Sequence, residues 1–348
     1  MEIRELLLLC IEKKASDLHL TENEPPLLRI DGKIFRTDLE KLKSEKLKSL
    51  IYSVLSNSQK ELFERDLELD FSIALPGLDR FRVNVHMQKG CVEAALRRVP
   101  LVIPGLQDLG LPQIVADMAR KHSGLILVTG PTGMGKTTTL AALIDLINNE
   151  RECMIITIED PIEFIFSNKK SVIKQREVYA DTRSFAEALK HTLRQDPNVI
   201  VVGEMRDLET IATTLTAAET GHLVLATLHT PDAPQTVERI IDVFPPYQQQ
   251  QVKLQLSDCL QCVVSQLLLP RADGRGRILA AEVMVATPGV RNLIREQEIE
   301  QIPTIMQTGA QYGMCTMDKS LKALYQSGMI SLDVAMSKVK DIEEFKEL

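Results

Sequence analysis

A glycine-rich loop that ends in lysine and threonine is the stretch best suited to chemistry. "GPTGMGKTT", residues 130–138, matches the pattern G-x-x-x-x-G-K-[ST] in full. Its glycines let backbone amides turn towards a phosphate, because no Cβ stands in the way. The amides and the amino end of the next helix, with about half a positive charge, would face a β-phosphate. The predicted nucleotide-binding residues are Gly130, Pro131, Thr132, Gly133, Met134, Gly135, Lys136, Thr137 and Thr138.

The surroundings of this loop favour the same interpretation. An apolar segment, residues 124–130, precedes the loop, and the helix-like "KTTTLAALIDLI" follows it. Lys136 would reach the β- and γ-phosphate oxygens, and the Thr137 hydroxyl would bind Mg²⁺. The loop recognises phosphates rather than bases, so the pattern indicates a nucleoside triphosphate and leaves ATP or GTP open.

Acidic residues follow two other apolar segments. Glu204 comes directly after Val199–Val202 and Gly203, and "TIEDPIEF", residues 157–164, contains Glu159 and Glu163. Parallel strands end at one edge of a sheet, so we expect these three acids to meet the glycine-rich loop at one crevice. Mg²⁺ needs only one or two protein carboxylates, often through water, which leaves another to orient or deprotonate the attacking water. Each acid taken alone could also be a solvated residue at a strand end.

Two histidines flank the apolar segment 223–228. His229 is expected at its carboxyl end, on the edge of the loop, where it would sense a γ-phosphate. His222 opens the segment, and the sequence leaves a structural and a functional role equally open for it.

Hydrophobic patterning predicts two domains of the α/β class. Strand-like alternation at 17–21, 27–31, 68–74, 80–88 and 91–99, with a helical stretch at 43–66, indicates a small α+β domain over residues 1–98. Prolines and glycines crowd residues 99–112, which we interpret as an interdomain linker and hinge. From 113 to 348 the segments 124–130, 153–159, 198–204 and 222–228 alternate with helices, as in a parallel sheet covered on both faces. The C-terminal helices, about 286–348, include 316–326 and a further one from Ser331.

Composition limits the classes of function. The net charge of −7 over 348 residues argues against a general electrostatic grip on nucleic acid or anionic lipid. The apolar run Leu6–Ile11 is short and flanked by glutamates, unlike a signal peptide, and no apolar stretch reaches the length of a membrane span. We expect a cytoplasmic protein without direct membrane insertion.

The six cysteines do not show zinc-ribbon spacing. Cys259 and Cys262 form one C-x-x-C inside a stretch that looks helical, residues 249–269. We expect buried core thiols there and no structural metal.

Taken together, these stretches resemble the secretion superfamily of hexameric ATPases that drive type II secretion and type IV pili. Residues 157–164 are similar to its Asp box, "NVIVVGEMRD" (198–207) to its atypical Walker B motif, and "GHLVLATLHT" (221–230) to its His box. The resemblance implies a RecA-like P-loop NTPase domain, preceded by a small PAS-like α+β domain. It implies that Glu204 activates water and that the companion acids, Glu159 and Glu163, belong to the Asp box. Our assignment is a catalytic role for Glu163 and Mg²⁺ binding, directly or through water, for Glu159 together with Thr137.

Two segments are similar to the pilus-retraction branch of that family. "ASDLHLT" (15–21) resembles its opening, and "VRNLIRE" (290–296) resembles a C-terminal retraction segment, with Val290 departing from the usual alanine. Val290, Leu293 and Ile294 predict one apolar helix face, and two arginines at i,i+4 indicate an acidic partner, a neighbouring element or a solvated pair. The retraction motif comprises Arg291, Asn292, Leu293, Ile294, Arg295 and Glu296. The expected absence of a further N-terminal domain and of a four-cysteine zinc module agrees with this branch.

The same resemblance implies a homohexamer that acts on an inner-membrane platform protein, which would hold the chain peripherally at the inner membrane. Arginines of the small domain, Arg80, Arg82 and Arg97, are candidates to touch a γ-phosphate; for each, a salt bridge to a nearby acid such as Asp70 is an equal alternative. Asp17 and His19 are expected to support the fold or to lie at an interface, rather than to take part in catalysis.

Other functions remain open at this stage. The chain could be an assembly or secretion ATPase or an accessory retraction motor, and pilus counts after gene deletion would distinguish these. A RecA-like nucleic-acid translocase is disfavoured by the acidic balance and by the absence of tryptophan. A nucleotide-dependent scaffold without turnover is disfavoured by the set of acids.

Overall fold

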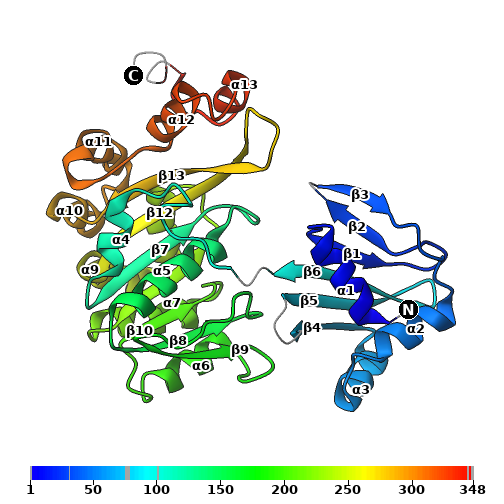
Figure 1. Cartoon of the computed structure of the whole chain (residues 1–348). Coiled ribbons are helices and arrows are strands. Elements are labelled where there is room, and N and C mark those ends of the chain that lie inside the picture. The colour runs from blue at the N-terminus through cyan, green and yellow to red at the C-terminus, as the bar shows by residue number, and fades with distance from the viewer. Residues whose placement is uncertain (1, 31, 75–78, 100–101, 343–344, 346–348) are drawn as a thin grey trace. The chain divides into compact units, whose positions relative to one another are not determined.

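The computed structural model describes residues 2–30, 32–74, 79–99, 102–342 and 345. It consists of two compact units, drawn in Figure 1: residues 1–102 with 163–165, and residues 103–162 with 166–348. Asp31 of the expected second strand and Pro100 of the expected linker lie outside the described residues. No helix within the described ranges has the length and apolar character to span a bilayer.

The N-terminal unit is built on an antiparallel sheet. Its strand order is β3-β2-β1-β6-β5-β4, formed by β1 (Asp17–Leu20), β2 (Leu27–Ile30), β3 (Lys33–Arg36), β4 (Glu68–Ala74), β5 (Arg80–Gln88) and β6 (Cys91–Val99). Helices α1 (Ile3–Glu12), α2 (Ser44–Tyr52) and α3 (Asn57–Asp66) contribute to one apolar core with this sheet. The α+β prediction is confirmed, but β3 was missed, because all four of its residues are exposed and show no alternation in burial.

The predicted helix over 43–66 is two helices. Ser56 begins the second one with a capping box: its Oγ accepts from Gln59 N at 3.3 Å, and Gln59 Oε1 accepts from Ser56 N at 2.9 Å. This reciprocal pair satisfies amides that a continuous helix would bond internally, so the chain restarts there.

The C-terminal unit has a seven-stranded sheet in the order β13-β12-β7-β11-β10-β8-β9. Strands β7 (Gly124–Thr129), β8 (Met154–Glu159), β9 (Val172–Glu177), β10 (Val199–Val202), β11 (Leu223–Leu228) and β12 (Leu260–Pro270) are parallel, and β13 (Arg277–Val285) is the antiparallel edge. The parallel-sheet prediction is confirmed, with one antiparallel strand added. All carboxyl ends of the parallel strands therefore lie at one edge.

Helices cover both faces of this sheet. On β7, Leu125 and Leu127 join a core with α6 (Phe185–Thr192), α7 (Leu208–Glu219), α8 (Ala233–Asp242), α9 (Pro246–Cys259) and α10 (Pro288–Glu296). Ile126 and Val128 point to the other face, towards α4 (Gln113–Ala119) and α5 (Lys136–Glu150). Burial on both faces explains why these strands read as continuous apolar runs.

The C-terminal elements are mostly short helices, shown in orange and red in Figure 1: α11 (Ile302–Thr308), α12 (Met317–Gln326) and α13 (Leu332–Met336), with 3₁₀ turns at Ile299–Gln301 and Gly309–Tyr312. Thr316 and Ser331 cap α12 and α13, as their positions in the sequence predicted.

The interpretation of 249–269 as one helix is wrong in its second half. Helix α9 ends at Cys259, and β12 begins at Leu260 beside β7. The two thiols are nevertheless buried and free, as expected, and burial raises the pKa of each to about 12. The apolar residues of 260–269 are compatible with a helix or a strand, and the segment forms a strand because it pairs with β7 and β13.

Candidate active site

The glycine-rich loop joins β7 to α5, as the strand–loop–helix pattern predicted. Gly135 caps α5 in the left-handed region, with φ +82°. Gly130 has φ +136°, and a Cβ there would stand 2.5 Å from the Gln266 carbonyl oxygen of β12. Only glycine allows the two backbones to approach so closely, so the loop is fixed against its neighbouring strand.

Lys136 is buried at the start of α5 and folds back over the loop. Its Nζ donates to the carbonyl oxygens of Gly130 at 2.7 Å and Pro131 at 3.1 Å. Burial lowers the pKa of this ammonium, and the negative charge of Glu204 opposes that shift. The cation is thus held inside the loop, where phosphate oxygens would meet it.

Glu204 stands at the carboxyl end of β10. A Cβ at the preceding Gly203 would lie 3.1 Å from the Ile158 oxygen of β8, so glycine permits the strands to stay together as β10 ends. Arg206 Nη2 donates to Glu204 Oε2 at 2.8 Å. Burial raises the pKa of the Glu204 carboxyl, but the Arg206 hydrogen bond and nearby positive charge outweigh it, so the net pKa is lowered. The group is a carboxylate at neutral pH.

His229 lies between Glu204 and the phosphate loop. Its Nε2 is 3.0 Å from Glu204 Oε1, while its Nδ1 is 3.4 Å from Lys136 Nζ and 3.3 Å from Thr132 Oγ1. An ammonium can only donate, so Nδ1 must accept and Nε2 must carry the proton that faces the carboxylate. The imidazole therefore connects the loop lysine with the strand-end acid.

His222 lies at the opposite, amino edge of the same strand. Its Nδ1 is 3.0 Å from Ala217 O and 3.3 Å from Thr220 Oγ1, at the end of α7. These contacts join the helix to the start of β11. Of the two alternatives left open by the sequence, the structure favours the structural role for His222.

Glu159 closes β8 beside the site. It is buried, and its Oε1 accepts from Thr157 Oγ1 at 2.6 Å and Gln175 Nε2 at 3.1 Å. Within the described part of the chain, no three His, Cys, Asp or Glu side chains form a group that could hold a metal by themselves. A magnesium ion that arrives with nucleotide phosphates would need only one or two protein ligands, for which Thr137 and Glu159 are the candidates.

Comparison with known proteins agrees with this geometry. The family model for type II/IV secretion system proteins matches residues 2–336. The chain belongs to this family. It is 47% identical over 345 residues to the type IV pilus retraction ATPase PilT of Pseudomonas aeruginosa, covering 99% of this chain and 100% of that protein. It is 46% identical over 318 residues to the twitching motility protein of Neisseria gonorrhoeae, covering 91% of this chain and 85% of that protein.

Solved structures show the same relationship. A crystal structure described as the pilus retraction motor PilT with bound ADP superposes with a TM-score of 0.94 and 48% identity over 100% of both chains. The ATPase DotB of Legionella pneumophila has a TM-score of 0.83 at 26% identity, covering 96% of this chain and 94% of that one. The α/β fold and the membership of the type II/IV secretion system family are thereby established.

The candidate arginines of this family member lie on β5 and β6 of the N-terminal unit. Arg82 Nη1 donates to Glu163 Oε1 at 2.8 Å, and Glu163 belongs to that same unit rather than to the sheet that carries Glu204. Arg97 Nε donates at 2.8 Å to Asp17, its direct neighbour across β1 and β6. Arg80 Nη2 donates to Ser72 Oγ. The salt bridges expected as the alternative therefore exist for Arg82 and Arg97, although with other acids than Asp70.

Asp17 supports the fold, as expected. It is 6% exposed, and it accepts from Ser16 Oγ at 2.8 Å as well as from Arg97. Burial raises the pKa of its carboxyl, the hydrogen bonds from Arg97 and Ser16 lower it, and the net shift is downwards.

Residues 291–296, which are similar to a retraction motif, form most of α10. Val290, Leu293 and Ile294 are buried, which confirms the predicted apolar face. Arg291 contacts a neighbouring element: it donates to Ala286 O at 2.9 Å, Asp258 O at 2.6 Å and Leu260 O at 2.8 Å, and also to Ser257 O. It thus binds the last carbonyls of α9. Arg295 Nη1 is 3.7 Å from Asp258 Oδ1.

Two groups at the site were not found from the sequence. Arg206 follows Glu204 by two residues, a spacing that predicts no contact. The turn after β10 directs its side chain towards the Glu204 carboxylate. Ser265 and Gln266 of β12, which contact the residues on either side of the loop, were not predicted because this strand was interpreted as helix.

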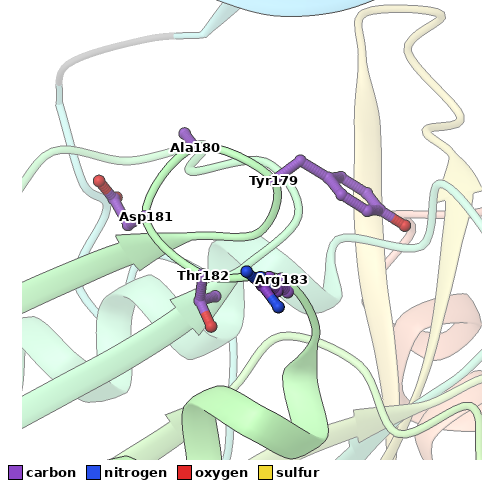
Figure 2. A pocket seen from close by; sticks show the side chains of 5 residues that line it. All are labelled: Tyr179, Ala180, Asp181, Thr182 and Arg183. Atoms are coloured by element: carbon purple, nitrogen blue, oxygen red, sulfur yellow. The ribbon is translucent and has the colours of Figure 1, made fainter.

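A hollow of about 370 Å³ lies elsewhere, on the loop between β9 and α6. It is lined by Tyr179, Ala180, Asp181, Thr182 and Arg183, and Figure 2 shows the Tyr179 ring directed away from the Asp181 carboxylate. None of the predicted site residues lines it.

Proposed function

We propose that this chain is a Mg²⁺-dependent ATPase that powers the retraction of type IV pili. The observation that carries the ATPase activity is the contact series from Lys136 through His229 to Glu204, which joins a phosphate-binding loop to an ionised carboxylate. The direction of movement is supported by full-length similarity to proteins named for pilus retraction and twitching motility.

The residues of the C-terminal unit divide the work of hydrolysis. Backbone amides of residues 130–138 and the Lys136 ammonium bind the phosphates. The Glu204 carboxylate accepts a hydrogen bond from the attacking water and orients it, and His229 fixes the direction of that carboxylate through its Nε2–H. Magnesium, held by Thr137 and Glu159, would supply positive charge to the phosphate oxygens.

The motor needs more than one subunit. We propose a homohexamer in which residues 99–112 act as the hinge between a PAS-like domain, 1–98, and the ATPase domain, 113–348. Arg80, Arg82, Arg97 and Glu163 would approach the γ-phosphate when the domains close, and hydrolysis would remove those contacts. Opening and closing around the ring would move an inner-membrane platform protein from the cytoplasmic side, without nucleic acid as a partner.

The decisive biochemical test compares two glutamates in assembled rings. Glu204→Gln should lower ATP turnover by roughly 10²- to 10⁴-fold, because it removes the acceptor for the proton of the attacking water. Glu219→Gln is the matched control, since Glu219 is exposed at the end of α7 and accepts only from Gln255 Nε2, at 2.9 Å, among the hydrogen bonds identified. Phosphate release measures both. Near-wild-type turnover of Glu204→Gln would overturn the assigned role.

The direction of movement needs a cellular test. Deleting the gene should leave surface pili in excess and abolish surface motility, because assembly continues without retraction. A strain that instead loses its pili would show that the chain is an assembly ATPase.

A further inference from the structure

Two consecutive residues of β12 bond the phosphate loop on both of its sides. Before the loop, Thr129 Oγ1 donates to Ser265 Oγ at 2.9 Å. After the loop, Gln266 Nε2 donates to Thr139 Oγ1 at 2.7 Å, in the first turn of α5. Between them, the Gln266 carbonyl faces the Cα of Gly130. A single strand position thus contacts the start of the loop and the helix that follows it.

The same strand supports the middle of the loop. The Leu268 amide lies 3.2 Å from Met134 Sδ, and a Cβ at Gly135 would be 3.4 Å from Leu268 Cδ1. These contacts are apolar or weak. The strong side-chain hydrogen bonds between β12 and the loop region are those of Ser265 and Gln266.

The Gln266 side chain has a buried polar atom without a hydrogen-bond partner in the described part of the chain. The residue is fully buried, and its Oε1 has no hydrogen-bond partner among the described residues. A buried polar atom left without a partner destabilises a folded protein, so glutamine is not the side chain that packing alone favours at this position.

We propose that Gln266 is a positioning residue for nucleotide binding: it sets the first turn of α5 relative to the start of the phosphate loop. The inference rests on the proposed ATPase function. The amides of the loop can converge on phosphates only if Gly130 and the amino end of α5 keep their spacing. Gln266 fixes both ends of that spacing, one through its carbonyl and the other through its side chain.

The test separates positioning from stability. Gln266→Leu should weaken ADP binding in Mg²⁺ buffer roughly 3- to 10-fold, the effect of about one lost hydrogen bond, and raise KM for ATP more than it lowers kcat. The melting temperature of the ligand-free protein should change little, because the variant removes the unpartnered Gln266 oxygen but also leaves the buried Thr139 hydroxyl without its donor. Thr139→Val should weaken ADP binding by the same factor, and Thr139→Ser, which keeps the hydroxyl, should restore it.

Gln261→Leu is the matched control on the same strand. Gln261 Nε2 donates to Ser123 O at 3.2 Å, at the opposite end of β12, so its replacement should leave ADP affinity within about twofold. The double variant Gln266→Leu/Thr139→Val should bind ADP no more weakly than either single variant, since both remove one contact.

Unchanged ADP affinity in Gln266→Leu and Thr139→Val, with a wild-type chain that binds ADP and hydrolyses ATP, would overturn this inference alone. So would a loss of affinity that Gln261→Leu reproduces together with a lower melting temperature. Should Gln266→Leu not fold, the Thr139→Val and Thr139→Ser pair decides. A wild-type chain that neither binds ADP nor hydrolyses ATP would end the proposed function, and the inference with it.

Discussion

The two edges of the C-terminal sheet use the same residue types for different purposes. At the amino edge, His222 and Gln261 bond backbone carbonyls and join one element to the next. At the carboxyl edge, His229 faces two charged side chains, and Gln266 contacts the phosphate loop. The residue type alone does not decide the role. Its position along the strand does, because only the carboxyl ends of parallel strands surround the crevice where ligands bind.

The largest effect expected from this comparison separates the two histidines of β11. His229→Gln should lower kcat for ATP by about 10²-fold, as for the loss of a donor aimed at a reacting group. His222→Gln should leave kcat within about twofold and reduce the free energy of unfolding by about 1 kcal/mol, the worth of one hydrogen bond. Steady-state kinetics and denaturant unfolding measure the two quantities. Equal losses of kcat would contradict a functional difference between the edges.

A second effect concerns the pH dependence of turnover. Burial raises the pKa of Glu204, but the hydrogen bond from Arg206 and nearby positive charge lower it by more, so the net pKa lies below its usual value. Arg206→Met should therefore raise this pKa and move the acid limb of the pH–rate profile to higher pH. The Glu204–Arg206 pair stabilises the fold at pH values above the unfolded-state pKa of the acid. This contribution is lost as the pH falls through the lower pKa of the folded state. Arg206→Met should therefore be less stable than the wild type at neutral pH and equally stable in acid.

Arg151→Met is the control for that profile. Arg151 donates to Lys121 O at 3.0 Å, at the amino edge, and does not contact Glu204 through any identified hydrogen bond. Its acid limb should coincide with that of the wild type. An unshifted limb in Arg206→Met would show that the arginine does not set the ionisation of Glu204.

The smallest effects on turnover are expected in α10. Arg291→Met should reduce the free energy of unfolding by about 2–3 kcal/mol, because several carbonyls at the end of α9 lose a charged donor. Arg295→Met should reduce the free energy of unfolding by under about 0.5 kcal/mol, since its ion pair with Asp258 is long and lies at the surface. Both should keep ATP turnover within about twofold when assayed below their melting temperatures. Urea titration measures the free energy of unfolding of both variants. Equal values would contradict the predicted difference between Arg291 and Arg295.

Local patterns predicted much of this site. The loop at 130–138 and the strand ends at Glu204 and His229 follow from short motifs that need no knowledge of distant partners. Strand β9 escaped notice because its polar sequence, VIKQRE, lies at the edge of the sheet and lacks a buried run. Strand β12 escaped because no glycine or proline separates it from α9, and only pairing with β7 decides its structure.

The expected meeting of three acids is a different case. Glu159 and Glu204 end neighbouring parallel strands, so their shared edge could be predicted. Glu163 comes after Pro161, beyond the end of β8. It belongs to the N-terminal unit, where it accepts a hydrogen bond from Arg82, and the strand pattern of the C-terminal sheet could not predict this contact. The rule that the carboxyl ends of parallel strands lie at one edge predicts the position of residues at those ends. It does not predict the position of residues a few places further along the following loop.

The grip of Arg291 has a consequence for how relatives of this chain can diverge. Every acceptor identified for it is a main-chain oxygen, from Ser257, Asp258, Leu260 and Ala286. Evolution can therefore exchange those four side chains without disturbing the contact, whereas no other amino acid supplies the same planar fan of donors at position 291. Among homologous sequences we expect an arginine that stays constant while the residues it holds drift freely.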